Sequence, residues 1–242
     1  MYDIAGFSQS DAAQCGSALR SISSGAGSVE DAANKIVQHL YNELGGAAPG
    51  EKACALVRFY KTHAYGELDT ELQKFADGIL GRPPDVKAVK CLTLLGTVGD
   101  KAEWNSRKNS NGHKAIPLPS EKVIAQIPMI SQLINQFGLE ASSVIKPEPS
   151  LLVDMQQKTY NVFHVADAKG SPYIPAQQDF VEPFGIRSVV GFGGVLASGN
   201  LFAVIMFCKV IVPRAAADNF KSLALDVKTA VQPLEGKKVF ST

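Results

Sequence analysis

The chain has 242 residues, of which 45% are hydrophobic and 19% are charged. This length supports one hydrophobic core of about 150 to 200 residues with peripheral segments. Its 24 Lys and Arg residues against 23 Asp and Glu residues leave a net charge of +1, and no run of five basic residues occurs. The sequence therefore lacks the charge that attracts nucleic acid or an acidic membrane, and we expect neither as a partner.

Neither the N-terminus nor any apolar stretch predicts secretion or membrane insertion. The first six residues lack the basic patch and long apolar core of a secretory signal, so we expect a cytoplasmic protein. The longest mostly apolar stretch, residues 188–212, is interrupted by glycines and serines. Its Val, Ile and Phe content favours strands over a membrane-spanning helix.

The four cysteines, Cys15, Cys54, Cys91 and Cys208, lie far apart and form no Cys-x-x-Cys pair. This spacing favours small buried hydrophobic residues in a reducing compartment over a disulfide framework or a zinc site. We therefore expect neither a disulfide nor a bound metal.

The first 27 residues are rich in Ser, Gly and Ala, a composition that buries little surface. We expect a flexible N-terminal arm there, with a short helix around residues 11–22. Ser28 is a candidate N-cap because acidic residues follow in the first turn, where the helix dipole favours negative charge. Apolar residues at helical spacing then predict an amphipathic helix over residues 29–44.

The next elements are a strand over residues 53–61, a helix over 68–80 that Gly81 ends, and a strand over 86–98. Residues 100–119 form a polar loop. At about twenty residues this loop is longer than compact domains normally contain, so it is either functional or locally disordered.

An apolar stripe predicts a third helix over residues 120–137, which Pro128 kinks or splits. A third strand is expected over residues 159–165. Residues 171–180 follow as an ordered loop or short helix, because their aromatic and apolar side chains need cover.

Two apolar strands joined by residues 197–200 and a final amphipathic helix from Ala217 to Val231 complete the predicted domain. We expect a single domain over residues 28–232 and a tail over 233–242. This order predicts the α+β class: an antiparallel sheet flanked by N- and C-terminal helices, with a long insertion of helix and loop in the middle.

Residues 185–194, which begin Gly-Ile-Arg-Ser, and the strand over 199–207 resemble the closing half of GAF domains. The chain is also similar to GAF-related input domains associated with bacterial histidine kinases, which contain sequence stretches resembling residues 55–63. The resemblance implies a GAF/PAS-like antiparallel sheet of six strands, a ligand or chromophore cavity on one side, and a homodimer formed through the terminal helices. The motif of the cyclic-nucleotide-binding members is absent.

The candidate ligand-binding residues come from the third strand and the connector that precedes the two closing strands. Aromatic walls with a few oriented polar groups are typical of small-molecule pockets. The candidates are Tyr160, Phe163, His164, Tyr173, Gln177, Phe180, Phe184 and Arg187. A well-packed connector without a ligand remains the alternative for residues 173–184.

Two candidates have a structural alternative. His164 can ligate haem iron from an apolar cavity, or it can be a hydrogen-bonded structural histidine. Arg187 can bind an anionic ligand, or it can pair with Asp179 or Glu182. Among the other histidines, we expect His63 at the surface.

Three functions remain open. The first is a non-enzymatic sensory module that binds a small molecule or a cofactor of unknown identity and modulates a histidine kinase or another signalling protein in a two-component system. The second is a ligand-free interaction or dimerisation module whose partner binds the 100–119 loop. The third is a thiol-dependent reductase, which requires an exposed cysteine of low pKa. We expect no catalytic residues, because no nucleophile motif occurs and the glycines at 191–194 lead into a strand and not a helix.

Overall fold

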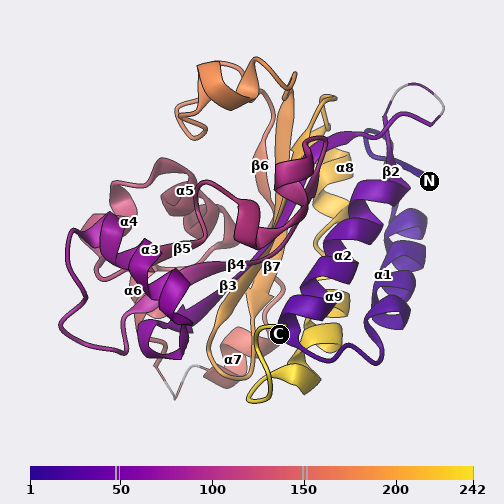
Figure 1. The fold of residues 1–242 in the computed structure, drawn as a ribbon. Helices are drawn as coiled ribbons and strands as arrows, with labels where there is room; N and C mark the ends of the chain where they lie inside the picture. The colour runs from indigo at the N-terminus through magenta and orange to yellow at the C-terminus, as the bar shows by residue number, and fades with distance from the viewer. Residues whose placement is uncertain (47, 49, 149, 151, 242) are drawn as a thin grey trace.

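The structure, a computed structural model, describes residues 1–46, 48, 50–148, 150 and 152–241. Its centre is a six-stranded sheet with the order β5-β4-β3-β8-β7-β6, in which all neighbouring strands are antiparallel (Figure 1). The strands are β3 (Cys54–Ala64), β4 (Lys90–Gly99), β5 (Ala115–Leu118), β6 (Phe163–Val165), β7 (Ser188–Val195) and β8 (Leu201–Cys208). Helices cover both faces, which confirms the predicted α+β class with an antiparallel sheet of six strands.

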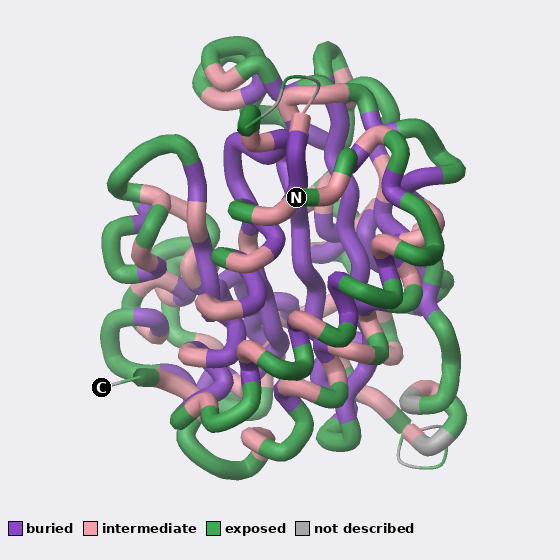
Figure 2. The backbone as a smooth tube through the Cα atoms, turned by 90° about the vertical axis from the view of Figure 1, so that its right-hand side faces the viewer, coloured by how far each residue is buried: buried purple, intermediate pink, exposed green. Residues whose placement is uncertain are grey.

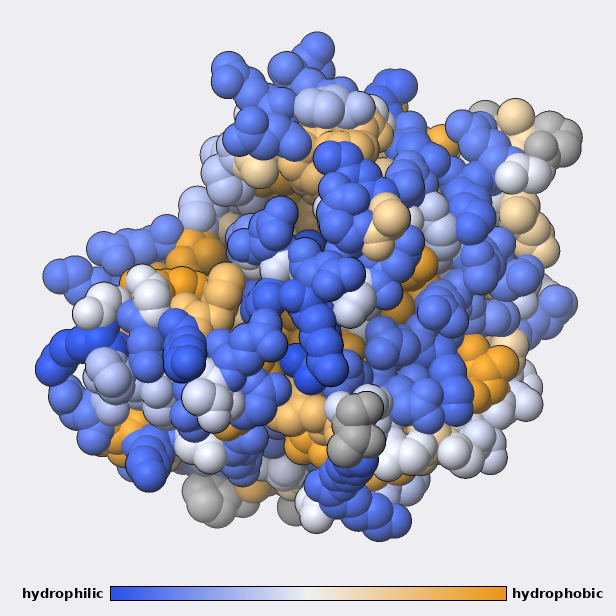
Figure 3. All heavy atoms as spheres, in the orientation of Figure 1, coloured by the Kyte–Doolittle hydropathy of each residue, from blue (hydrophilic) through white to orange (hydrophobic). Residues whose placement is uncertain are grey.

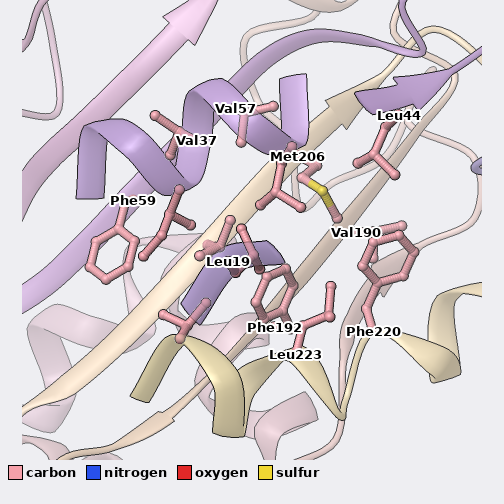
Figure 4. Close-up of a cluster of buried hydrophobic side chains, with 14 of the residues drawn as sticks. Leu19, Val37, Leu44, Val57, Phe59, Val190, Phe192, Met206, Phe220 and Leu223 are labelled. Atoms are coloured by element: carbon pink, nitrogen blue, oxygen red, sulfur yellow. The ribbon is translucent and has the colours of Figure 1, made fainter. Parts of the chain in front are cut away.

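One face of the sheet is covered by helices from the two ends of the chain. These are α1 (Gln9–Ser23), α2 (Val29–Glu43), α8 (Arg214–Asn219) and α9 (Leu223–Val231). Figure 4 shows Leu19, Val37, Phe192 and Leu223 from four different elements in this hydrophobic cluster. The single final helix predicted from the sequence is thus divided into α8 and α9.

Helix α2 packs closely against β4. It begins as predicted, because the Ser28 side chain accepts a hydrogen bond of 3.0 Å from Asp31 N. At Gly96 the backbones come so close that a Cβ would lie 2.7 Å from the carbonyl carbon and oxygen of Ala33. Gly96 therefore sets the distance between this helix and the sheet.

The opposite face is covered by α4 (Glu121–Ala125), α5 (Pro128–Phe137), α6 (Ala141–Ile145) and α7 (Leu152–Gln157). The predicted helix over 120–137 is split at Pro128, which occupies the first turn of α5 where its missing N–H costs nothing. Ile130, Leu133 and Phe137 of α5 join the second hydrophobic cluster, on this face of the sheet.

Shorter elements complete the edges. Helix α3 (Thr70–Leu80) packs beside β5 and ends at Gly81, whose φ of 75° gives the predicted left-handed cap. The short helical turns are η1 (Tyr65–Glu67), η2 (Ala102–Asn105), η3 (Arg107–Asn109), η5 (Gln177–Val181) and η6 (Gln232–Leu234). Outside the main sheet, β1 (Tyr2–Asp3) pairs with β2 (Leu44–Gly45). Strand β5 lies inside the predicted loop. It tolerates Pro117 because it is an edge strand.

The expectation of a loose N-terminal arm is wrong. Within residues 1–27, Phe7 stacks on Phe220 with ring centroids 4.1 Å apart, and Cys15 and Leu19 are fully buried. Helix α1 packs against α2 and α9 (Figure 1). Figure 2 shows buried residues along the middle of the molecule and exposed residues on the loops around it. The small residues that suggested flexibility allow α1 to lie close to its neighbours while a few large side chains supply the apolar contact.

The C-terminal segment, defined here as residues 232–241, is also packed and is not a free tail. Val29 N and Glu30 N donate to the carbonyls of Lys238 and Val239 at 3.2 and 2.9 Å. Ser241 N donates to Glu30 Oε2 at 2.8 Å. The segment thus supplies acceptors for N–H groups at the start of α2, which have no acceptor within the helix. Thr242 lies outside the described residues.

The C-terminal segment covers two polar side chains of β3. Lys61 and His63 are 3% and 1% exposed, so the expectation that His63 lies at the surface is wrong. Lys61 Nζ lies 3.1 Å from Glu235 Oε1 and 3.3 Å from His63 Nε2. Burial, followed by the charge of Lys61, lowers the pKa of His63 from 6.5 to about 3.

His63 should make stability depend on pH. Unfolded His63 binds a proton near pH 6.5, whereas native His63 stays neutral down to about pH 3, so acidification favours the unfolded state across this window. We expect the free energy of unfolding to lose up to about 1.4 kcal/mol per pH unit through this residue. Urea unfolding of the wild type and His63→Asn at pH 7, 5 and 4 measures the difference. Parallel pH profiles would contradict the assignment.

In the described part of the chain, no helix has both the length and the apolar character needed to cross a membrane.

Candidate functional site

The predicted ligand residues do not meet in one place. Phe163 and Val165 of β6 point into the cluster beneath α5, whereas His164 between them points to the opposite face. Because side chains alternate along a strand, His164 cannot share a pocket with Phe163. The structure thus separates residues that the sequence predicts as one site.

His164 forms hydrogen bonds through its ring Nε2 and through its backbone. Its ring Nε2 lies 2.9 Å from the carbonyl of Val212, and its backbone N donates to Gln136 Oε1 at 2.7 Å. Gln136 Nε2 donates back to the carbonyl of His164 at 3.3 Å. Burial lowers the pKa of His164 below 6.5 and favours the neutral ring. These contacts fit a hydrogen-bonded structural histidine, the alternative to a haem ligand.

Four other candidates also lie apart from a common cavity. Tyr160 is buried and donates to the carbonyl of Met155. Tyr173 is 37% exposed, and Gln177 holds its own loop together through Ala168 and Ile174. Arg187 is exposed, and none of the ion pairs among the described residues includes it. The predicted pairing of Arg187 with Asp179 or Glu182 is therefore not observed.

Phe180 and Phe184 do line a cavity, which we name the Arg58 pocket. Its volume is about 230 Å³. It is lined by Arg58, Lys101, Glu103, Trp104, Asn109, Ser110, Asn111, Gly112, Asp179, Phe180 and Phe184. The pocket lies between the connector before β7 and the loop after β4, over the face of the sheet that α4 to α7 cover. The surface facing the viewer in Figure 3 is mainly hydrophilic, with hydrophobic atoms in small separate patches and in recesses.

Three aromatic rings form one wall of the Arg58 pocket. Trp104 meets Phe184 and Phe180 edge to face, with ring centroids 4.6 and 5.6 Å apart. Phe180 in turn packs edge to face on Phe207 of β8 at 4.9 Å. Trp104 can approach the sheet closely here because Gly99 has no side chain, and a Cβ there would lie 2.7 Å from the indole.

Arg58 forms the polar side of the pocket. It comes from central strand β3 and is half-buried. Its two terminal nitrogens lie 3.2 Å from Tyr60 Oη and from Ser110 Oγ, both of them uncharged groups. Its Nε is buried without a hydrogen-bond partner among the described residues. A partly buried guanidinium whose hydrogen-bond partners are all neutral gains from a negative charge, so this group can bind an anion.

Thr97 adds a second unsatisfied polar atom beside Arg58. The two residues are direct cross-strand partners in the β3–β4 ladder, so their side chains lie on the same face. Thr97 is 2% exposed, and its Oγ1 has no partner among the described residues. Buried polar groups are nearly always hydrogen-bonded, so two such atoms side by side are unusual for a purely structural surface.

Charges of both signs lie at the rim of the Arg58 pocket. Lys101 Nζ lies 3.7 Å from Glu103 Oε1 and 4.8 Å from the centre of the Phe184 ring. Asp179 is exposed and forms none of the ion pairs found among the described residues. The rim thus carries a net charge of −1, opposite in sign to the charge of Arg58 inside the pocket.

The loop that lines the pocket also contacts the C-terminal segment. Arg107 lies between Trp104 and Ser110, is 7% exposed and donates through Nε to Glu30 Oε1 at 2.7 Å. Its guanidinium lies 4.7 Å from the centre of the Phe240 ring. Residues 101–112 therefore connect the pocket on one face of the sheet to the end of the described chain on the other.

A larger groove of about 460 Å³ lies between α1 and the α8–α9 segment. Its charged side chains neutralise one another, since Arg20 pairs with Asp226 and Lys221 with Asp218. Three buried polar atoms of the sheet lack hydrogen-bond partners among the described residues, namely Arg58 Nε, Thr97 Oγ1 and His63 Nδ1, and none of them lines this groove. We therefore place the candidate site at the Arg58 pocket and not at the larger groove.

All four cysteines are buried and unpaired. Burial raises the pKa of Cys15 and of Cys91 to about 12, and contact with Cys208 raises that of Cys54. Thiolates are thus disfavoured at these positions. Among the described residues, no three His, Cys, Asp or Glu side chains gather closely enough to hold a metal ion.

The sequence prediction missed Arg58, Trp104 and Ser110. Two signals were present. The long polar loop contains the only tryptophan of the chain, a large residue that needs apolar contact. Arg58 interrupts an otherwise apolar run in a central strand, where a charged side chain requires a functional or structural partner.

Comparisons with known proteins add little to this geometry. No protein-family model matches the chain, and no curated protein matches it. One similar solved structure is the phycoerythrobilin-bound GAF domain from a cyanobacterial phytochrome, with 11% sequence identity and a TM-score of 0.38. The match covers 93% of this chain and 97% of that chain. At this similarity the match supports no inference about ligand, and the fold class rests on the strand order described above.

Proposed function

We propose that this chain is a non-enzymatic sensory module of GAF type that binds a small molecule in the Arg58 pocket and modulates a signalling partner. The observation that carries the proposal is Arg58 on a central strand beside an aromatic wall, with neutral partners at its terminal nitrogens and no partner at Nε among the described residues. Apolar walls with a few oriented polar groups are the usual composition of small-molecule sites.

The output would reach the partner through the C-terminal segment. Trp104 and Ser110 line the pocket, and Arg107 between them contacts Glu30 and Phe240. A ligand that binds more tightly to one conformation of this loop would increase the population of that conformation. The contacts of residues 238–241 would change with it. A histidine kinase or another signalling protein would respond to this change.

The burial of the cysteine thiols supports a non-enzymatic role over the thiol-dependent reductase considered above. A reductase requires an accessible thiolate, whereas burial raises the pKa of Cys15 and Cys91 to about 12.

We also propose a homodimer formed through the terminal helices. Leu225, 68% exposed on α9, would contribute to that interface.

Trp104 provides a direct test, because it is the only tryptophan and lines the pocket. Screening small carboxylates, phosphorylated compounds and neutral metabolites should identify compounds that change its fluorescence and raise the midpoint of thermal unfolding. Phe184→Ala should weaken the binding of such a compound about tenfold, because it removes a ring in contact with Trp104.

Tyr173→Ala is the matched control. Tyr173 is an exposed aromatic residue of the same connector but does not line the pocket, so binding should not change. Equal losses in the two variants, or the absence of any compound that alters Trp104 emission at millimolar concentration, would contradict the proposed function.

A further inference from the structure

We propose that the ligand of the Arg58 pocket is a small aromatic carboxylate, a molecule with one ring and one negative charge. This inference rests on the proposed function and specifies the class of ligand. Four properties of the pocket carry it: the partners of Arg58, the aromatic wall, the volume and the charges at the rim.

The first property is the partnering of Arg58. Its terminal nitrogens contact the hydroxyls of Tyr60 and Ser110 at 3.2 Å, so both hydrogen-bonding partners are neutral. Its Nε lacks a partner among the described residues. A carboxylate matches the planar geometry of a guanidinium and supplies the missing negative charge, which neutral ligands cannot do.

The second property is the aromatic wall. Trp104, Phe180 and Phe184 line one side of the pocket and contact one another edge to face or tilted. Aromatic pairs in offset or edge-to-face geometry are more favourable than area burial alone predicts. A ligand ring held by these residues would direct its acidic group towards Arg58.

The third property is size. A cavity of about 150 Å³ binds one benzene molecule. The Arg58 pocket, at about 230 Å³, has space for one ring and a short acidic substituent. Ligands with several fused or linked rings exceed this volume.

The fourth property is the charge at the rim. Glu103 and Asp179 line the pocket and are exposed, and only Glu103 has a cation, Lys101, within 4 Å. Two acidic groups near the entrance disfavour ligands of higher negative charge. A phosphate monoester carries a charge of about −1.5 to −2 at pH 7, so a monocarboxylate should be preferred over it.

The test uses four probes on the whole chain: phenylacetate, phenylphosphate, benzyl alcohol and acetate. Trp104 fluorescence and isothermal titration calorimetry measure the affinities. We expect phenylacetate to bind more tightly than the other three. In Arg58→Met, which keeps an unbranched apolar stem but removes the charge, phenylacetate should bind at least about tenfold more weakly, while benzyl alcohol should bind as it does to the wild type.

Asp179→Asn keeps the test valid if Arg58→Met does not fold. Removing this acidic group from the rim should strengthen phenylacetate binding several-fold, and raising the salt concentration should reduce the gain. Unchanged phenylacetate affinity in either folded variant would overturn the inference.

The remaining outcomes separate the inference from the proposed function. If benzyl alcohol binds the wild type as tightly as phenylacetate does, the pocket is a ligand site without selectivity for anions, and only the inference fails. Tighter binding of phenylphosphate would also overturn the inference alone. If neither these probes nor any screened compound alters Trp104 emission, both fail.

Discussion

Replacing Arg107 by Met is expected to lower the free energy of unfolding by about 3 to 5 kcal/mol, because the carboxylate of Glu30 would remain buried without its cation. The change also removes the cation that lies against Phe240. Urea denaturation of the wild type and the variant measures the loss.

The matched control is Arg82→Met. Arg82 pairs with Asp85 at 3.0 Å, but both side chains are more than two-thirds exposed, 71% and 73%. Exposed ion pairs contribute about 0 to 1 kcal/mol, so the control should lose little. Similar losses in the two variants would contradict the assignment of a buried, stabilising pair to Glu30 and Arg107.

A second measurement addresses the C-terminal segment. Because Glu30 also accepts a hydrogen bond from Ser241 N, loss of Arg107 should loosen this segment first. Amide hydrogen exchange at residues 238–241 should accelerate in Arg107→Met more than exchange in the central strands does. The double variant Glu30→Gln, Arg107→Met should recover part of the stability, since no buried charge remains unpaired.

Gly96→Ala is the second variant with a large expected effect. Its Cβ would lie 2.7 Å from the backbone of Ala33, so α2 must move away from the sheet. Overpacking of this kind costs about 1 to 3 kcal/mol. Because a main-chain contact cannot be relieved by a change of rotamer, we expect the upper half of that range in thermal or urea unfolding.

Gly78→Ala, in contrast, should raise the free energy of unfolding. Gly78 lies in exposed helix α3, and a Cβ there would meet nothing within 4 Å. Alanine in a helix is favoured over glycine by about 0.5 to 1 kcal/mol. Destabilisation by Gly78→Ala, or neutrality of Gly96→Ala, would contradict the close approach of α2 to β4.

The sequence predicted most elements correctly where local rules determine them. The N-cap at Ser28, the left-handed end at Gly81 and the break at Pro128 all follow from backbone chemistry within a few residues. The errors occur where distant contacts decide. Residues 1–27 were expected to be loose from their composition, yet Phe7 packs on Phe220, more than 200 residues away.

The site was predicted only in part for the same reason. Phe180 and Phe184 line the Arg58 pocket, but the other six candidates do not. Position on a strand predicts which face a side chain occupies, and this alternation alone separates His164 from Phe163. That Trp104 and Arg58 line the same pocket could not be predicted, because it depends on how a long loop returns over the sheet.

The strand order also determines when this protein can fold. The central strands β3 and β8 are neighbours, although Thr62 and Leu201 at their junction are 139 positions apart. Closing so long a stretch of chain is entropically unfavourable and slow. During synthesis, β3 emerges from the ribosome well before its partner exists, so its apolar side chains must remain exposed or be shielded by chaperones. The middle of the sheet therefore cannot form until β8 has been synthesised.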